Sequence, residues 1–455
     1  MAHEPPRGHS PTDRLAAFAD RVSAWTETPI LAAIRTGVVA VVPLTIVGGL
    51  FVLLANPPIP VWNDQLARWR DLLQVPVAVT FGVLALFVCL AVAHDLAGRR
   101  GLDPLAATLP AVAAFLLLAV DPASGSLSPA PLGAQGILTA ILVAVSAVEL
   151  QRWLTRRRLV IRLPAEVPAV VGESFAALVP LTVLLTLVWV LRFGLGIDLM
   201  ATVQTVCRPL LAALDTLPGI LVYALLVTGL WALGINGDNA LDAVVAPVFL
   251  QELAANTAAW EQGGAAPHVT ALGFFTTFVN VGGTGGTLAL ALVLLRSRDP
   301  VCRRIARLSL PTQIFQINEP LFFGLPVVLN PLLMVPYVAS AVVLTASTWA
   351  LMEWNLIGRP VVNVPWTTPP VIGHYLVTGG DWRAAVWGLA SIPLAMAIYW
   401  PFARRHERRT RASPPISATA SPPISATASP PTSATASPPT SATASPPTGV
   451  TNPRP

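Results

Sequence analysis

The sequence contains no lysine and few charged residues of any kind. Charged residues make up only 11% of the 455 residues, and all 28 basic side chains are arginine. Hydrophobic residues make up 54%. This balance excludes an ordinary soluble domain and indicates a chain embedded in a lipid bilayer. The arginines cluster at the ends of apolar runs, so the net charge of +5 predicts membrane topology and no nucleic-acid partner.

Cysteine and histidine are also scarce. The three cysteines, Cys89, Cys207 and Cys302, lie far apart, so we interpret them as inert thiols. The six histidines form no pair at metal-ligand spacing. The sequence therefore predicts no metal site and no cofactor.

A cleavable signal sequence is missing as well. The first thirty residues are polar and include Pro5, Pro6, Asp13 and Arg14, where a signal sequence needs an apolar run. We therefore expect residues 1–30 to form a polar leader in the cytoplasm.

The first part of the chain consists of uncharged runs long enough for membrane spans. A helical span needs about 20 mostly apolar residues. The runs cover residues 36–55, 72–94, 105–120, 132–148 and 174–191. No acidic residue interrupts them, so residues 31–195 are predicted to form a regular N-terminal membrane half.

Arginine clusters predict which loops face the cytoplasm. They lie at 99–100, 152–162, 296–307 and 404–411. Since arginine is enriched in cytoplasmic loops, this pattern places both termini inside and the loop 121–131 outside. We expect a multi-pass protein of the cell membrane.

The second part, residues 196–403, is interrupted. Glycine and asparagine break one apolar run at 234–239, glycines break another at 281–287, and prolines break a third between 320 and 331. Short apolar pieces broken in this way are typical of a transporter's binding site. We predict an all-α polytopic membrane protein with about ten spans and two re-entrant hairpins, around residues 236 and 319.

One carboxylate, Glu319, stands alone in the third broken segment. The nearest charges before and after it are Arg307 and Glu353. A carboxylate at membrane depth is costly unless it is paired, hydrogen-bonded or facing water, and broken backbone at that depth lines a cavity or is buried in protein. With Asn318 beside it, Glu319 indicates a polar substrate site. The alternative is a structural glutamate that accepts backbone amides.

The glycine run 281–287 has two interpretations. A phosphate-binding loop would need a lysine followed by serine or threonine, and a preceding strand, and the run has neither. A close approach of helices, or a break beside the substrate, is the favoured interpretation.

The end of the chain has a different composition. From Ser413, octapeptides of serine, proline, threonine, alanine and isoleucine repeat to Ala444. Such sequence cannot bury a core, so residues 404–455 are predicted to be a disordered tail. A glycosylated mucin-type stalk has a similar composition, but the predicted topology places this tail in the cytoplasm and favours a tether or a segment without function.

Residues 317–331, Ile-Asn-Glu-Pro-Leu-Phe-Phe-Gly-Leu-Pro-Val-Val-Leu-Asn-Pro, resemble the signature of the IIC membrane subunits of sugar phosphotransferase systems. The similarity is greatest to the lactose, cellobiose and diacetylchitobiose family. Further similar motifs are Phe-Val-Asn-Val-Gly-Gly-Thr at 278–284 and Pro-Trp-Thr-Thr-Pro-Pro at 365–370. The resemblance covers about residues 15–405.

The resemblance implies a homodimer in which residues 31–195 form the scaffold and the C-terminal half carries a β-linked disaccharide or related sugar. Glu319 would hydrogen-bond the sugar hydroxyl that becomes phosphorylated. The phosphoryl group would come from a cysteine of a separate IIB subunit, supplied in turn by IIA. The chain itself would then translocate sugar without a catalytic residue of its own, and no IIA or IIB domain is expected within it.

The resemblance also selects the residues expected to bind the sugar. Indole rings would stack on its C–H face, whereas amides and a carboxylate would bind its hydroxyls. A membrane-interface belt residue is the alternative for Trp366. The predicted site residues are Trp231, Asn236, Asn280, Asn318, Glu319 and Trp366.

One position departs from the family pattern. The family motif Gly-Ile-His-Gly is Gly-Ile-Asn-Gly here, with Asn236 in place of histidine. An amide keeps a donor and an acceptor but cannot carry a proton near neutral pH. Two alternatives therefore stay open, a sugar carrier that does not phosphorylate and a membrane sugar sensor.

Overall fold

The computed structural model describes residues 24–55, 67–159, 169–325 and 330–412, together with 21, 65, 161 and 327. No β-strand occurs among these residues, and one isolated bridge joins Val120 and Leu127. The predicted all-helical class is confirmed. Most of the polar leader and the repeats from residue 413 onward lie outside the described residues.

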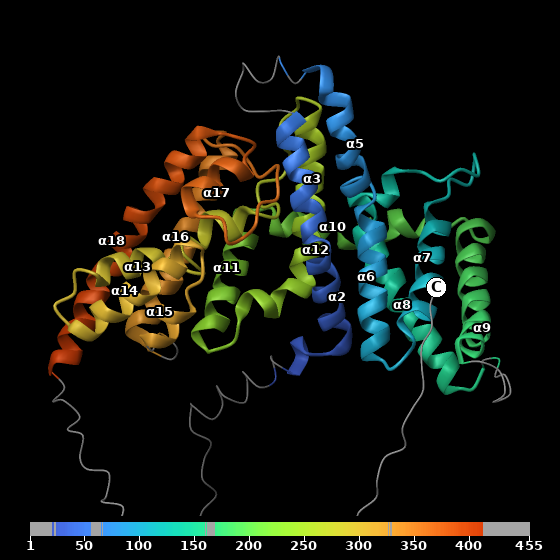
Figure 1. The fold of residues 1–455 in the computed structure, drawn as a ribbon, viewed down its shortest axis with the longest axis horizontal. Coiled ribbons are helices and arrows are strands. Elements are labelled where there is room, and N and C mark those ends of the chain that lie inside the picture. The colour runs from blue at the N-terminus through green and yellow to red at the C-terminus, as the bar shows by residue number, and fades with distance from the viewer. Residues whose placement is uncertain are drawn as a thin grey trace, which may run out of the picture. The chain divides into compact units, whose positions relative to one another are not determined.

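The first helices match the five uncharged runs of the sequence (Figure 1). They are α2 Pro29–Ala40, α3 Val42–Ala55, α5 Arg70–Thr80, α6 Leu84–Arg99, α7 Pro104–Ala119, α8 Ile137–Arg156 and α9 Ala169–Trp189. A π-helical turn, Val190–Gly194, leads from α9 towards α10 Leu199–Leu214. Short 3₁₀ turns lie at Ala67–Trp69, Ala130–Leu132 and Ala134–Gly136.

The later helices are shorter and more often interrupted. They are α11 Leu217–Ala232, α12 Gly237–Glu261, α13 Thr287–Leu294, α14 Pro300–Ile314, α15 Glu319–Gly324, α16 Pro331–Glu353, α17 Pro370–Val377 and α18 Trp382–Ala412. A π-helix, η5 Phe274–Val279, precedes the glycine run. The breaks at 234–239 and 281–287 lie where the sequence predicts them. The third break, predicted between 320 and 331, begins earlier: residues 315–318 separate α14 from α15, and Pro320 lies in the first turn of α15, where proline is tolerated.

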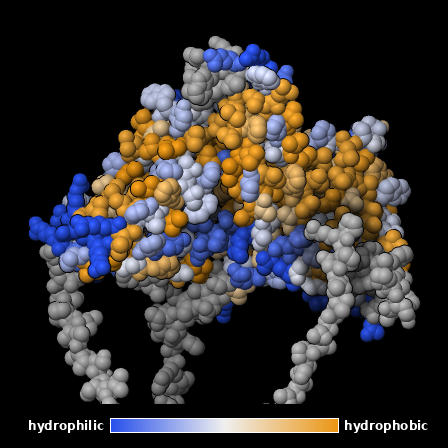
Figure 2. Space-filling view, viewed as in Figure 1, coloured by the Kyte–Doolittle hydropathy of each residue, from blue (hydrophilic) through white to orange (hydrophobic). Residues whose placement is uncertain are grey.

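Several helices are long and apolar enough to cross a membrane. Five such segments occur among the described residues: Pro29–Ala55, Arg70–Arg99, Ala134–Arg156, Leu332–Glu353 and Trp382–Arg409. The pair Leu178–Gly194 and Leu199–Leu214, bent by 86°, would make a sixth. Figure 2 shows hydrophobic surface over much of the visible face, with hydrophilic residues gathered along its lower edge. Membrane helices are thus confirmed, whereas the number of about ten spans stays a prediction.

Two hydrophobic cores form around different helices. In the first, α6 packs against α2, α7 and α8 and buries Val88, Cys89 and Val92. In the second, α11 packs against α16. Each core is built mainly from one part of the chain, the first between residues 33 and 188 and the second between 214 and 403.

Two elements extend further than the sequence indicates. The apolar piece 243–251, too short to cross a membrane by itself, is part of the 25-residue helix α12. This helix continues because buried polar side chains find partners: Asn256 Nδ2 donates to the carbonyls of His268 and Pro360, at 2.7 and 2.8 Å. Helix α18 likewise continues to Ala412, past the predicted start of the tail at 404.

The packing of α2 on α6 depends on Gly37. A Cβ atom at this buried position would lie 2.4 Å from Val92 Cγ2 and 2.8 Å from Val92 N. Gly37→Ala should therefore destabilise the protein by about 1–3 kcal/mol, as overpacking does. Thermal unfolding of the detergent-purified protein measures this loss.

The matched control is Gly98→Ala on α6, where a new Cβ would meet no atom within 4 Å. Alanine favours a helix over glycine, so this variant should keep or slightly raise the melting temperature. Equal melting temperatures for the two variants would show that α2 does not approach α6 so closely.

Candidate functional site

The first break joins α11 to α12. Helix α11 ends at Ala232, and Gly234 adopts a positive φ of 85° before α12 begins. Asn236 caps α12, since its Oδ1 accepts a hydrogen bond from the Asn239 amide at 2.9 Å. Asparagine is a preferred residue at this position because it satisfies an amide that the helix leaves unpaired. The Asn236 side chain is thereby fixed at the break.

Asp238, in the first turn of α12, is the centre of a hydrogen-bond cluster. Its Oδ2 accepts hydrogen bonds from Trp231 Nε1 at 2.8 Å and from Thr284 Oγ1 at 2.9 Å. The side chain of Asn280 also faces this carboxylate. A negative charge in a first helical turn is further stabilised by the helix dipole. Asp238 therefore connects the first break to the glycine run.

The second break comes very close to the third. Gly283 has a φ of 107°, and a Cβ there would lie 2.4 Å from Asn318 Cβ, so this position requires glycine. Asn318 is buried, and its Nδ2 donates to the Thr284 carbonyl at 3.2 Å. Thr284 thus contacts Asp238 through its hydroxyl and Asn318 through its carbonyl.

The third break contains Gln316 and Glu319. Gln316 has a φ of 65°, which is uncommon for a residue with a Cβ, and its Nε2 donates to the Thr368 carbonyl at 3.0 Å. Glu319 is the first residue of α15; its side chain is exposed and has no hydrogen-bond partner among the described residues. Phe322, on the same helix, packs edge-on against Trp231 with 5.4 Å between ring centroids.

The structure brings four of the six predicted site residues into one region. Trp231, Asn280 and Asn318 surround Asp238 and Thr284, and Asn236 lies two residues before Asp238. Glu319 follows Asn318 but leaves its carboxylate exposed. Trp366 is 56% exposed, and the Gln316–Thr368 hydrogen bond connects its loop to the third break. The roles assigned to these residues stay predictions.

Several polar atoms near the breaks are buried without a partner among the described residues. They include Asn280 Oδ1, Gln316 Oε1 and both polar side-chain atoms of Gln313. Buried polar groups are normally hydrogen-bonded, and leaving one unpaired costs about 1–3 kcal/mol. They need partners other than the described residues, such as water or a polar ligand.

The prediction from sequence missed Asp238 and Thr284. The sequence does draw attention to Asp238, because this residue lies inside the 234–239 interruption that marks the first break. Its hydrogen bond to Thr284, 46 positions away, is not revealed by any local pattern.

A separate cavity of about 830 Å³ lies between α5, α10 and α12. None of the six predicted site residues lines it.

Comparison with known proteins identifies the family. Residues 35–341 match the family described as "Phosphotransferase system, EIIC". The chain is 34% identical over 439 residues to the cellobiose-specific EIIC component of the phosphotransferase system from Geobacillus stearothermophilus, covering 90% of this chain and 97% of the relative. It is 32% identical over 404 residues to the lichenan permease IIC component of Bacillus subtilis, covering 83% and 89%.

A solved structure agrees with this assignment. The transporter ChbC, the IIC component from the N,N'-diacetylchitobiose-specific phosphotransferase system, superposes with a TM-score of 0.82 at 32% identity. The superposition covers 87% of this chain and 97% of ChbC. The chain therefore belongs to the EIIC family of the phosphotransferase system, whose members are membrane-embedded sugar permeases.

Proposed function

We propose that this permease binds a β-linked disaccharide or related sugar at the Asp238 cluster and moves it inward for phosphorylation by a separate IIB subunit. The cluster consists of Trp231, Asp238, Asn280, Thr284 and Asn318. The proposal rests on one observation: three broken segments meet around the carboxylate of Asp238. Such breaks are where transporters bind their substrates.

The unpaired atoms suit a sugar. Asn280 Oδ1, Gln316 Oε1 and the Glu319 carboxylate can accept hydrogen bonds from hydroxyl groups. The exposed ring of Trp366 offers an apolar face for sugar C–H groups. A hydrocarbon lipid tail would leave every one of these acceptors unpaired. The relatives named for cellobiose and N,N'-diacetylchitobiose support the disaccharide class.

The two hydrophobic cores support a division into a scaffold, residues 31–195, and a transport half, residues 196–403. We assign the first and third breaks to two re-entrant hairpins, within a total of about ten spans. A homodimer formed through the scaffold, with both termini in the cytoplasm, completes this architecture. IIB and IIA would reach the sugar from that side.

The residue at position 236 bears on whether sugar transport is coupled to phosphorylation. Its Oδ1 is committed to capping α12, which leaves its Nδ2 as a donor for the sugar but provides no base. We therefore expect sugar binding to be retained and phosphorylation to rely on Glu319. A carrier without phosphorylation is the second candidate, and sugar uptake by proteoliposomes separates both from a membrane sensor.

Glu319→Gln should weaken sugar binding by about tenfold or more, for a lost contribution of about 1.5 kcal/mol. The substitution keeps the shape and replaces a charge-assisted acceptor with a neutral one. Calorimetric titration of the purified protein with cellobiose measures the effect. Glu353→Gln, at the end of α16 and paired with Arg359, is the matched control and should bind normally. Unchanged binding by Glu319→Gln would show that the Glu319 carboxylate does not contribute to sugar binding.

Asn236→His should introduce a pH dependence that the unaltered protein lacks. Because an amide does not titrate, sugar affinity of the unaltered protein should vary little between about pH 5.5 and 7.5, around the pKa of about 6.5 of an ordinary histidine. The same titrations at several pH values test this. Asn239→His, one turn along and exposed, controls for an added imidazole. Identical pH profiles for both variants would contradict a direct contact between residue 236 and the sugar.

Phosphorylation by a IIB partner then separates the two candidate functions. We expect the unaltered protein to support it, since Glu319 and its surrounding motif are intact. If transport occurs with no phosphorylated product, and Asn236→His restores the product, the uncoupled carrier is the correct assignment.

A further inference from the structure

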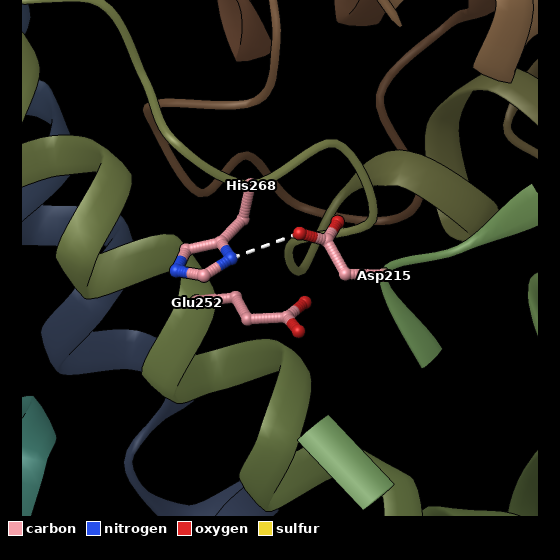
Figure 3. A group of neighbouring side chains, drawn as sticks. All are labelled: Asp215, Glu252 and His268. Atoms are coloured by element: carbon pink, nitrogen blue, oxygen red, sulfur yellow. Dashed lines mark hydrogen bonds and ion pairs between the residues drawn. The ribbon is translucent and has the colours of Figure 1, made fainter. Parts of the chain in front are cut away.

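A second polar cluster lies beside the C-terminal half of α12, at the edge of the 830 Å³ cavity. It consists of Asp215, Glu252 and His268, which we call the DEH cluster (Figure 3). Asp215 ends α10, Glu252 lies within α12, and His268 belongs to the loop that follows α12. None of the three is part of the proposed sugar site, so a role for the DEH cluster is independent of the proposed function.

The three side chains converge. One ligand atom from each lies within 4.8 Å of the others, and His268 Nδ1 is 3.0 Å from Asp215 Oδ2. Figure 3 shows the carboxylate of Glu252 below this hydrogen bond, on the side of the imidazole that faces Asp215. Two carboxylates and one imidazole therefore surround a common point.

The cluster is held in place by the backbone around it. Asp215 Oδ1 accepts hydrogen bonds from the amides of Val269 and Thr270, at 2.8 and 3.1 Å. The backbone of His268 is fixed on both sides by Asn256, which accepts from its amide at 2.8 Å and donates to its carbonyl at 2.7 Å. Such surrounding hydrogen bonds orient ligands in metal sites.

Glu252 is the unsatisfied member. It is only 2% exposed, and its Oε1 has no hydrogen-bond partner among the described residues. Its Oε2 has one long contact, 3.4 Å, with a Thr270 hydroxyl that also donates to the Leu214 carbonyl. An ionised buried carboxylate without donors is unstable by several kcal/mol unless it takes up a proton or a cation compensates it. The geometry thus leaves a place for positive charge between Glu252, Asp215 and His268.

We propose that the DEH cluster binds a divalent transition-metal ion of the Zn²⁺ type. One imidazole nitrogen with two carboxylate oxygens is a ligand set suited to Zn²⁺, whereas Ca²⁺ and Mg²⁺ favour oxygen ligands alone. The ion replaces the His268–Asp215 hydrogen bond, and the protons that it displaces from the three ligands pass to the solvent. Its two positive charges then balance the two ionised carboxylates. Three protein ligands leave a further coordination position open towards the cavity, for water or a ligand group.

An ion bound at the DEH cluster would hold separate segments of the chain together. Its ligands come from the end of α10, from α12 and from the loop after α12, so a bound ion cross-links these three segments. The cavity is also lined by Pro129 and Ala130, which belong to the loop 121–131 that the arginine distribution predicts to lie outside the cell. The ion would therefore be acquired from the external side. Histidine spacing in the sequence gave no sign of this site, because its ligands lie on separate segments.

Zn²⁺ titration of the metal-free, full-length protein in detergent tests the proposal. We expect one saturable site by calorimetry, together with a higher melting temperature when Zn²⁺ is present, since a ligand that binds only the folded state stabilises it. Glu252→Gln and His268→Ala should each weaken binding by about tenfold or more. Glu261→Gln changes another carboxylate on α12 that lines the same cavity, and it should leave the affinity unchanged.

X-ray absorption of the Zn²⁺ complex adds a readout of the ligands themselves, expected as nitrogen and oxygen neighbours without sulfur. If His268→Ala fails to fold, Glu252→Gln, which keeps the side-chain shape, decides the test. Absence of saturable Zn²⁺ binding would overturn the proposal and leave the cluster a protonated hydrogen-bond network. Equal binding by the unaltered protein and by folded Glu252→Gln would overturn it too, because the ion would then lie elsewhere.

Discussion

Asp238 accepts hydrogen bonds from an indole and a hydroxyl that belong to two separate segments of the chain. In a membrane protein such a carboxylate needs these donors, because water and lipid cannot replace them at low cost. The rest of the site depends on this requirement. Helix α11 must end close enough for Trp231 to reach the carboxylate, and the glycine run must present Thr284. Gly283 then lets Asn318 approach, so that the Thr284 carbonyl joins the third break to the first two.

This arrangement explains why the two parts of the chain look different. Around α6, apolar faces pack on apolar faces, and unbroken helices are sufficient. Around the Asp238 cluster the backbone is interrupted three times, and each interruption frees backbone and side-chain groups to make polar contacts. The residual unpaired atoms, such as Asn280 Oδ1, are acceptors that a sugar can use. The geometry of this region is thus compatible with the sugar transport that the family membership indicates.

Much of this fold could be predicted from the sequence because its signals are local. Uncharged runs predict α2 to α9, glycines predict the breaks before α12 and α13, and prolines predict the break between α15 and α16. The contacts that join the breaks could not be predicted, because Asp238 and Thr284 lie 46 positions apart and their pairing results from packing. For the same reason the motif selected Glu319 and Asn236 but not Asp238. The DEH cluster was missed because Asp215, Glu252 and His268 are close only in the folded chain.

The role of the Asp238 cluster is tested most sharply by the sugar affinity of Asp238→Asn, measured by calorimetry with cellobiose or N,N'-diacetylchitobiose. Losing the charge that orders Trp231 and Thr284 should weaken binding by about tenfold or more, as expected for a charge-assisted hydrogen bond. The control is Asp242→Asn, one turn further along α12. The Asp242 side chain makes no hydrogen bond to the described residues of the Asp238 cluster, so this variant should bind the sugar almost as well as the unaltered protein. A folded Asp238→Asn variant with unchanged sugar affinity would contradict the claim that the three breaks form the sugar site around this carboxylate.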